Sequence, residues 1–294
     1  MRILNFGSLN IDHVYSVEHF VAPGETLSVT AYSKNAGGKG LNQSIALARA
    51  GATVCHGGMI GEDGRFLSAL LEAEGVDVTH LAVSALPTGH AVIQVAPDGQ
   101  NSILVCAGAN GGIAPDEMEA VLSSFEAGDW LLLQNEVVGL PLLISLAKAR
   151  GMRVILNPSP VTAELLGADL SAVDCLILNE IEGLALTGEG LPEKILDRLA
   201  ERYPRAEVVL TLGADGAWWQ AEGKRIYRPA HRVDAVDTTA AGDTFTGYFL
   251  ASRTAGSDPQ EALERAMLAA AIAVTRPGAA SSVPHRKELD SYKF

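Results

Sequence analysis

The residues best suited to chemistry lie in the segment 237–243, which reads Asp-Thr-Thr-Ala-Ala-Gly-Asp. Asp237 and Asp243 enclose a run of small residues, and an apolar pattern typical of a helix follows. Small residues at the start of a helix leave backbone N–H groups able to bind an anion. A carboxylate beside such a site repels phosphate unless it takes a proton from the group that attacks that phosphate. The segment alone fits a catalytic base at Asp243 and an ordinary acidic residue in a first helical turn equally well.

A second segment, residues 35–42, reads Asn-Ala-Gly-Gly-Lys-Gly-Leu-Asn. Its glycines would let a ligand approach the backbone closely. Lys39 adds a positive charge, and Asn42 lies on the first turn of a predicted helix that ends at Gly51. A Walker A loop would have Ser or Thr after Lys39, and no Gly-x-Gly-x-x-Gly motif opens a helix in the chain. Alone, this segment favours a tight turn between a strand and a helix.

Taken together, the two segments resemble the signatures of the ribokinase branch of the carbohydrate-kinase family named after the minor phosphofructokinase, PfkB. The resemblance runs from residues 7–12 to 276–278 and includes the segments 107–110, 179–182 and 211–213. It implies an ATP-dependent kinase that phosphorylates the primary hydroxyl of a pentose, with D-ribose as the first candidate and D-ribose 5-phosphate as its product. The alternative is the same chemistry on 2-deoxyribose, another pentose, a ketohexose or a nucleoside.

Two rival functions come from other classes. A sugar-binding regulator that has lost turnover would be expected to lack the base or the glycine, yet Asp243 and Gly242 are both present. A dehydrogenase is a common function of doubly wound sheets, but it needs the dinucleotide motif that this chain lacks. Both rank below the kinase.

The composition limits the partners of this 294-residue chain. Its formal charge of −13 disfavours nucleic acid and anionic membranes, although a lysine, backbone N–H groups and a metal can still hold ATP locally. The three cysteines, Cys55, Cys106 and Cys175, lack metal-binding spacing. No stretch resembles a signal peptide or is apolar over the length of a bilayer. We therefore expect a soluble, cytoplasmic protein with small-molecule substrates.

A recurring order of helix, glycine and apolar strand indicates the fold. Gly51, Gly75 and Gly151 each follow a helical pattern and precede an apolar run, as expected for left-handed caps before buried strands. Alternation of this kind predicts a three-layer α/β/α, doubly wound and mostly parallel sheet, with ligands beyond the carboxyl ends of the strands. Polar or glycine residues follow the predicted strand ends at Asn10, Asp12, Glu136, Asn157, Asn179 and Gly213.

Residues 11–34 and 88–107 break this order. They contain alternating segments at 14–17, 26–29, 91–95 and 102–105. Such alternation around Pro-Gly and Asp-Gly turns predicts a small antiparallel sheet, or else an edge extension of the main sheet. The α/β domain would then consist of residues 1–10, 35–87 and 108–294. The resemblance implies that the small sheet is a lid over the sugar and a homodimer interface.

The resemblance also assigns roles at the sugar. Asp243 would be the general base, and the backbone of Ala240, Ala241 and Gly242 would form an anion hole whose donors are fixed before charge develops. The positions that match sugar ligands are Asn10, Asp12, Gly38, Lys39, Asn42, Glu136 and Asp243. Asn135 stands where many relatives have an apolar residue, so it bears on specificity for ribose.

Further positions match the nucleotide and metal sites of the family. Those for the nucleotide are Asn179, Thr211, Gly213, Gly216, Gly242 and Met267. Glu182 would hold Mg²⁺ through water, although Asn179 and Glu182 also fit a helix capping box. Those for a monovalent K⁺ site, built largely of carbonyl oxygens, are Asp237, Thr239, Ala273, Arg276, Gly278 and Ser282.

Overall fold

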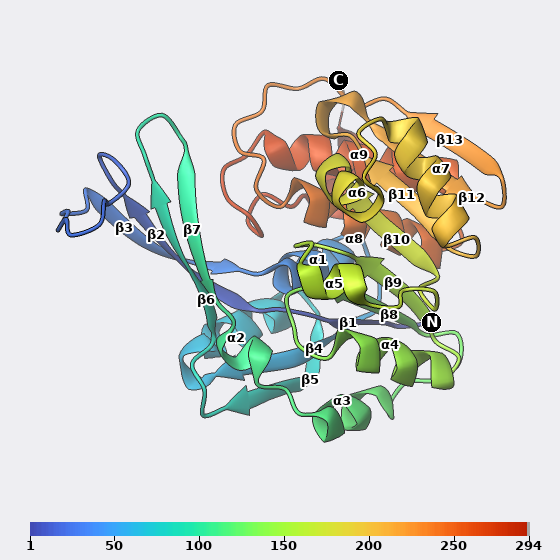
Figure 1. The fold of residues 1–294 in the computed structure, drawn as a ribbon, viewed down its shortest axis with the longest axis horizontal. Coiled ribbons are helices and arrows are strands. Elements are labelled where there is room, and N and C mark those ends of the chain that lie inside the picture. Colours follow the sequence, from blue (N-terminus) through green and yellow to red (C-terminus); the bar gives the residue numbers. More distant parts are fainter. Residues whose placement is uncertain (293–294) are drawn as a thin grey trace.

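The computed structural model describes residues 1–292, and its main feature is a large β-sheet (Figure 1). Within this range the sheet has nine strands in the order β13-β12-β11-β10-β9-β8-β1-β4-β5. The strands are β1 (Ile3–Phe6), β4 (Val54–Gly61), β5 (Asp77–Ser84), β8 (Trp130–Gln134), β9 (Arg153–Asn157), β10 (Cys175–Asn179), β11 (Glu207–Thr211), β12 (Ala217–Ala221) and β13 (Lys224–Arg228). Pairing is parallel from β11 to β5, whereas β12 and β13 are antiparallel. The predicted, mostly parallel α/β sheet is confirmed.

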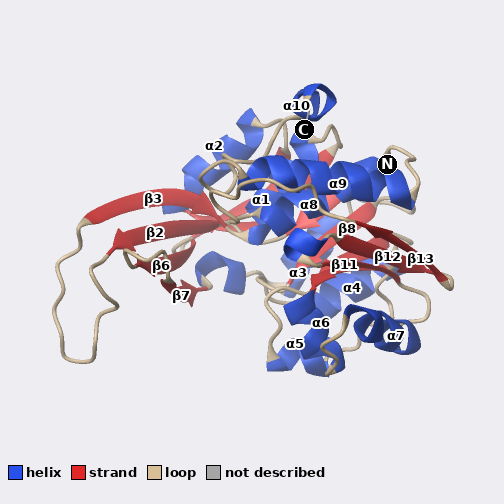
Figure 2. Cartoon of the chain, turned by 90° about the horizontal axis from the view of Figure 1, so that it is seen from above, coloured by secondary structure: helices blue, strands red, loops and turns tan. Residues whose placement is uncertain are grey.

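Helices cover both faces of this sheet (Figure 2). One apolar cluster lies under α1 (Lys39–Arg49), α2 (Arg65–Ala73), α8 (Ala241–Thr254), α9 (Pro259–Val274) and α10 (Arg286–Ser291). The other lies under α3 (Pro115–Leu122), α4 (Leu140–Ala149), α5 (Ala163–Gly167), α6 (Glu180–Thr187) and α7 (Pro192–Arg202). Short 3₁₀ helices occupy Glu62–Gly64, Gly108–Gly111 and Gly213–Asp215. In residues 1–292, no helix has the length and apolar character needed to cross a membrane.

The predicted glycine caps explain how the chain turns from helix to strand. Gly51 and Gly151 have φ values of 96° and 72°, a region that glycine adopts without a steric penalty. The strands that follow, β4 and β9, are almost wholly buried. Because both faces carry helices, these strands do not alternate: β9 has an apolar centre, and β4 buries His56 among apolar and glycine residues.

A small sheet projects from one side of the body (Figures 1 and 2). Its strands, in the order β3-β2-β6-β7, are β2 (Asn10–Ser16), β3 (Ala31–Gly37), β6 (Gly89–Val95) and β7 (Asn101–Cys106). The pairs β2–β3 and β6–β7 are antiparallel, as predicted, whereas β2 and β6 are parallel. The parallel pair joins two hairpins that are separated in the sequence by helices and strands of the main body.

One predicted strand of the small sheet is wrong. The alternating segment 26–29 is a loop, and the strand is β3, from Ala31 to Gly37. The ladder fixes this register, because Ser16 pairs with Ala31 and the carbonyl of Ser16 accepts from Thr30 N at 2.9 Å. Residues 17–30 therefore form the connection, and their alternation has no partner strand.

Two helices far apart in the sequence lie side by side and position the site. α1 starts directly after β3, and α8 packs along it. A Cβ atom added to Gly247 in α8 would lie 2.4 Å from the Cβ of Ala46 in α1, so the helices touch closely at this point. This contact places the first turn of α8 opposite the first turn of α1.

Candidate active site

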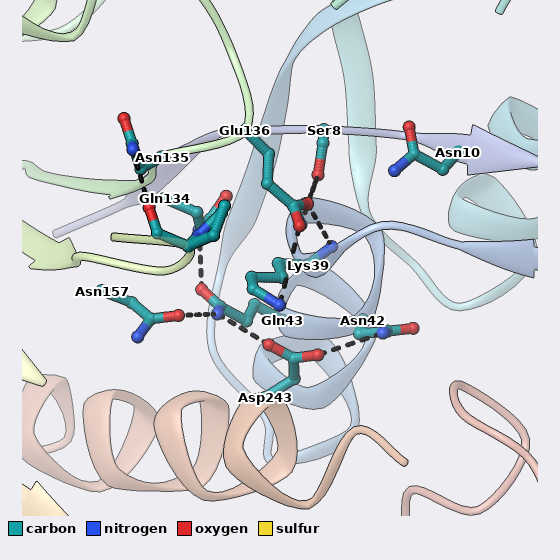
Figure 3. A network of polar contacts seen from close by, with 12 residues as sticks. Ser8, Asn10, Lys39, Asn42, Gln43, Gln134, Asn135, Glu136, Asn157 and Asp243 are labelled. Atoms are coloured by element: carbon teal, nitrogen blue, oxygen red, sulfur yellow. Dashed lines mark hydrogen bonds and ion pairs between the residues drawn. The ribbon is translucent and has the colours of Figure 1, made fainter. Parts of the chain in front are cut away.

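Asp243, in the first turn of α8, is held by two side chains from α1. Its Oδ2 accepts a hydrogen bond from Asn42 Nδ2 at 3.0 Å, and its Oδ1 accepts one from Gln43 Nε2 at 2.8 Å (Figure 3). The predicted base and the predicted sugar ligand Asn42 therefore lie in direct contact, although 200 residues separate them in the chain. Both carboxylate oxygens accept a hydrogen bond, so the side chain has a defined orientation.

The electrostatics at Asp243 suit a proton acceptor. Burial raises the pKa of Asp243, and this effect exceeds the opposing ones of the Lys39 ammonium and the two amide donors. Burial alone would lower the pKa of Lys39, but the carboxylates of Glu136, Asp243 and Glu182 raise it overall. Lys39 thus remains charged, and Asp243 is a more basic carboxylate than an exposed one.

The start of α8 has backbone donors that no helical carbonyl satisfies. Ala240 has a left-handed conformation with φ of 58°, and the Ala241 N–H donates to Thr238 O at 3.2 Å. The N–H groups of Gly242 and Asp243 have no acceptor within the helix, since they belong to its first turn. A Cβ added to Gly242 would meet no atom within 4 Å. An anion can therefore approach this helix end.

A cavity of about 180 Å³ lies over the helix end. It brings together predicted residues of several elements, namely Lys39, Asn179, Glu182, Thr211, Ala240, Ala241, Gly242 and Asp243. Asn179 and Glu182 also form the capping box of α6, with bonds of 2.9 and 3.0 Å, so the structural alternative for this pair is present as well.

Three predicted nucleotide residues lie outside the lining of this cavity. Gly213 and Gly216 occupy the turn between β11 and β12 and have positive φ angles. Met267 lies on α9, is 7% exposed and packs in the apolar core. Its contact with an adenine ring stays a prediction.

Glu136 is the centre of the predicted sugar side. Its Oε2 accepts from Ser8 Oγ and, at 3.1 Å, from the backbone N–H of Lys39. The Lys39 ammonium lies 3.6 Å from Glu136 Oε1. Asn10 is fixed nearby, because its Oδ1 accepts from Asn110 Nδ2 at 2.8 Å. Ser8 and Asn110 thus support two predicted sugar ligands.

Asp12 is a perturbed carboxylate on the sugar side. Burial, followed by the neighbouring Glu136 carboxylate, raises the pKa of Asp12 to about 6. A pair of partly buried carboxylates is costly without donors. Hydroxyl groups of a sugar would supply such donors.

A second cavity, of about 410 Å³, borders Asn10 and Glu136 and includes Asn135. The Asn135 side chain donates to Pro160 O at 2.7 Å and to Thr162 Oγ1 at 3.2 Å. It thus bonds the loop before α5 and lies apart from Lys39 (Figure 3). Its effect on sugar choice stays a prediction.

The close backbone approach expected of the glycine run is made by the chain itself. A Cβ added to Gly40 would lie 2.5 Å from backbone atoms of Gly7 and Ser8, and one added to Gly38, where φ is 95°, would lie 2.9 Å from Ser8 O. A Cβ at Gly37 would meet the Asp12 carboxylate. These glycines let α1 start against the β1–β2 connection, which places Lys39 beside Glu136.

The predicted K⁺ residues lie on two loops that Asp237 joins. Its Oδ1 accepts from Thr239 N at 2.9 Å, and its Oδ2 accepts from Gly278 N at 2.8 Å. The backbone N–H of Asp237 also donates to Val274 O at 3.1 Å. Ala273, Arg276, Gly278 and Ser282 lie at the end of α9 and in the loop after it. The loop that leads into α8 is therefore tied to the second loop.

Sequence reasoning missed a buried set of amides behind Asp243. Gln43, Gln134 and Asn5 are each at most 1% exposed and are hydrogen-bonded to one another in series. Asn5 interrupts the apolar strand Ile3–Phe6, and Gln134 ends the run Trp-Leu-Leu-Leu-Gln. A polar residue within an otherwise apolar buried strand was the available signal, because such groups need partners.

Comparison with known proteins assigns the family. The sequence model described as pfkB family carbohydrate kinase matches residues 2–286. A ribokinase of Haemophilus influenzae is 40% identical over 96% of this chain and 95% of its own. A deoxyribokinase of Salmonella typhi is 31% identical over 99% of this chain and 98% of its own.

Solved structures agree with this assignment. The ribokinase of Cryptococcus neoformans in complex with ADP has a TM-score of 0.86 at 35% identity and covers 99% of both chains. The ribokinase of Arabidopsis thaliana complexed with ribose and ATP has a TM-score of 0.86 at 32% identity, over 99% of this chain and 97% of that one. The chain belongs to the pfkB family of carbohydrate kinases, which are ATP-dependent sugar kinases.

Proposed function

We propose that the protein transfers the γ-phosphoryl group of ATP to the primary hydroxyl of D-ribose and forms D-ribose 5-phosphate. The observation that carries this proposal is the Asp243 carboxylate, which Asn42 and Gln43 orient beside the open N-terminus of α8. A base and an anion site in one helical turn match the two needs of phosphoryl transfer to an alcohol. The similarity to ribokinases over nearly the whole chain supports ribose as the acceptor.

In this proposal Asp243 takes the proton of the attacking hydroxyl. The backbone at the start of α8, contributed by Ala240, Ala241 and Gly242, would hold the transferring phosphoryl group, and the Ala241 N–H would leave Thr238 O to do so. Lys39 adds positive charge near both groups and remains protonated, because carboxylates surround it. Fixed donors stabilise developing charge without reorganising, and this accounts for most of the expected acceleration.

The remaining hydroxyl groups of the sugar would contact the sugar side. The proposed ligands are Asn10, Asp12, Gly38, Lys39, Asn42 and Glu136. Bound hydroxyls can donate to the Asp12 and Glu136 carboxylates, which offsets the cost of holding two acids close together.

The small sheet would close over the sugar as a lid. We take residues 11–34 and 88–107 as this lid and the rest of the chain as the α/β domain.

The nucleotide would lie along the cavity over α8, with Asn179, Thr211, Gly213, Gly216, Gly242 and Met267 as proposed contacts. Glu182 would hold Mg²⁺ through water, and an oxygen ligand that lines this cavity fits a cation that keeps much of its hydration. Within residues 1–292, no cluster of three acidic, His or Cys side chains is placed for a metal. When bound, Mg²⁺ would neutralise phosphate charge.

We further propose K⁺ on the two loops that Asp237 joins, where the ligands would be carbonyl oxygens of Asp237, Thr239, Ala273, Arg276, Gly278 and Ser282. The ion would order the loop that leads into α8.

We also propose a homodimer through the small sheet, whose outer strand β7 is exposed along its whole length and includes Leu104, which is 68% exposed. Because ATP is its phosphoryl donor, we place the enzyme in the cytoplasm.

2-Deoxy-D-ribose is the second candidate acceptor. The observation that favours it is the similarity to a deoxyribokinase, at 31% identity over 99% of this chain. The two sugars differ only in the 2-hydroxyl group. A site built to bond that hydroxyl rejects the analogue that lacks it, because a buried polar group is then left unpaired.

The test is ATP consumption by the purified protein with Mg²⁺ and K⁺ against D-ribose, 2-deoxy-D-ribose, other pentoses, ketohexoses and nucleosides. The phosphorylated position is then identified by NMR of the product. The highest kcat/KM with D-ribose and phosphate on its primary oxygen support the proposal. A clear preference for 2-deoxy-D-ribose would establish the second candidate, and no turnover of any acceptor would refute both.

A further inference from the structure

We propose that Gln43 is a positioning residue that locks Oδ1 of Asp243 as a hydrogen-bond acceptor and leaves Oδ2 as the atom that takes the substrate proton. This inference rests on the proposed kinase function. It comes from the direction of the hydrogen bonds in the buried amide series behind Asp243, which joins Asn5, Gln134, Gln43 and Asn157.

One end of the series is fixed by a backbone carbonyl. Asn5 Nδ2 donates to Gly40 O at 2.8 Å, and a carbonyl oxygen can only accept, so Asn5 Oδ1 must face the other way. Asn5 Oδ1 accepts from Gln134 Nε2 at 2.9 Å, and the same Nε2 donates to Gln43 Oε1 at 2.6 Å. Gln134 keeps this orientation although its Oε1 has no partner within the described residues.

The other end of the series is fixed in the same way. Asn157 Nδ2 donates to Ile177 O at 2.9 Å, so Asn157 Oδ1 faces Gln43 and accepts from its Nε2 at 3.0 Å. Two backbone carbonyls thus determine which side of the Gln43 amide carries nitrogen. The assignment of oxygen and nitrogen, which an isolated amide leaves open, is determined here by the network. Gln43 must present its NH₂ group to Asp243.

This orientation makes the two oxygens of Asp243 unequal. A proton on Oδ1 would point at the donor Gln43 Nε2, which has no free acceptor to offer. Oδ2 faces Asn42 Nδ2, and the Oδ1 of Asn42 is buried without a partner among the described residues. No hydrogen bond therefore fixes the oxygen of the Asn42 amide. The amide can turn this oxygen toward a protonated Oδ2 of Asp243.

The proton transfer then has a defined path. The O–H bond of the sugar breaks, and an O–H bond forms at Asp243 Oδ2. The electron pair left on the sugar oxygen forms the new bond to the γ-phosphorus, while the bond from that phosphorus to the bridging oxygen breaks and its electron pair leaves with ADP. Gln43 contacts neither substrate in this scheme, and it acts only through Asp243.

The charged groups that act on Asp243 are Lys39, which lowers its pKa, and Glu136, which raises it. Gln43 also lowers the pKa of Asp243, because its N–H stabilises the ionised form. Loss of this donor should therefore raise the pKa of Asp243 while Lys39 and Glu136 stay in place. A pH profile thus separates a role at Asp243 from a general role in folding.

The experiment compares Gln43→Met with wild type across pH 5 to 9. Met has similar length but no N–H group. We expect kcat to fall by about 100-fold, the loss typical of a base displaced by about 1 Å, with little change in KM for sugar or ATP. The acid limb of the kcat profile should move to higher pH. An unchanged kcat, or an acid limb that stays in place, would overturn the proposal.

Gln220→Met is the matched control, because Gln220 is also buried, at 5% exposure, and donates to a backbone carbonyl, Leu196 O, far from Asp243. It should lower stability without moving the pH profile. If Gln43→Met does not fold, Gln134→Met decides, because it keeps the Gln43 N–H groups but removes the donor that fixes Gln43 Oε1, together with a hydrogen bond to Asn5 Oδ1. That variant should move the acid limb in the same direction, and an unmoved limb would contradict the lock.

The two proposals fail in different ways. A wild-type protein that phosphorylates no acceptor would refute the proposed function. An active wild type whose Gln43 and Gln134 variants keep the wild-type profile would refute the positioning role alone.

Discussion

Gly247→Ala should damage catalysis from a position that no substrate reaches. Gly247 lies one turn after Asp243 on α8, where α8 packs against α1. The added Cβ would lie 2.4 Å from Ala46 Cβ and 2.8 Å from the backbone of Ala46 and Leu47. Carbon atoms normally rest at roughly 3.5–4.0 Å, so the helices must move apart by about 1 Å. Asn42, Gln43 and Asp243 would then lose their present geometry.

The size of the effect follows from two terms. Overpacking of this kind costs about 1–3 kcal/mol, and replacing glycine within a helix returns about 0.5–1 kcal/mol. The net expectation is a loss of about 0–2.5 kcal/mol in the free energy of unfolding. A shift of about 1 Å at the base costs about 100-fold in kcat.

The assay is kcat at saturating ATP and sugar, together with urea unfolding of the same preparations. Gly167→Ala is the control, because a Cβ at this end of α5 would meet no atom within 4 Å. The control should keep wild-type kcat and lose no stability. A Gly247→Ala protein with wild-type kcat would refute the argument that the α1–α8 contact sets the position of the base.

Other perturbations test separate parts of the site. The raised pKa of Asp12, about 6 when folded against 3.8 when exposed, means that its contribution to stability is present below pH 4 and lost as the pH rises to 6. Asp12→Asn should therefore resist urea better than wild type at pH 7.5 but not at pH 3.5, while KM for the sugar rises; equal urea midpoints at pH 7.5 would contradict this. Replacing K⁺ by tetramethylammonium should lower the initial rate, and Asp237→Ala should raise the K⁺ concentration needed for half-maximal rate. A wild-type rate that is the same with either cation would exclude the K⁺ site. Leu104→Glu should convert a dimer to a monomer in sedimentation velocity, and an unchanged assembly would place any interface elsewhere.

The sequence predicts the body of the fold because its signals are local. Left-handed caps at Gly51 and Gly151 and the buried runs that follow them suffice to order the helices and strands. The segment 26–29 shows the limit of such signals, since alternation alone does not choose a register. Ser16 pairs with Ala31 instead, and the longer connection leaves 26–29 in a loop.

The candidate site is predictable only in part for the same reason. Asp243 and Asn42 belong to recognisable segments, but the contact between them depends on how α8 packs on α1. Gln43 stands beside Asn42 in the same segment, yet nothing local shows that its amide faces Asp243. Its role needs Gln134 and Asn157, which come from two separate strands. Likewise, the glycine at position 40 suggests that a ligand approaches the backbone there. In the structure, the backbone of Gly7 and Ser8 occupies the space beside Gly40.

The most direct test of the central claim is a single-turnover measurement with Asp243→Asn. Labelled phosphoryl transfer from γ-³²P ATP to D-ribose would be followed at saturating enzyme, and binding of both substrates would be measured separately. Loss of a general base predicts a rate lower by about 10²–10⁴-fold or more, with sugar and ATP still bound, because the side chain keeps its shape. Undiminished transfer by Asp243→Asn would contradict the assignment of Asp243 as the base.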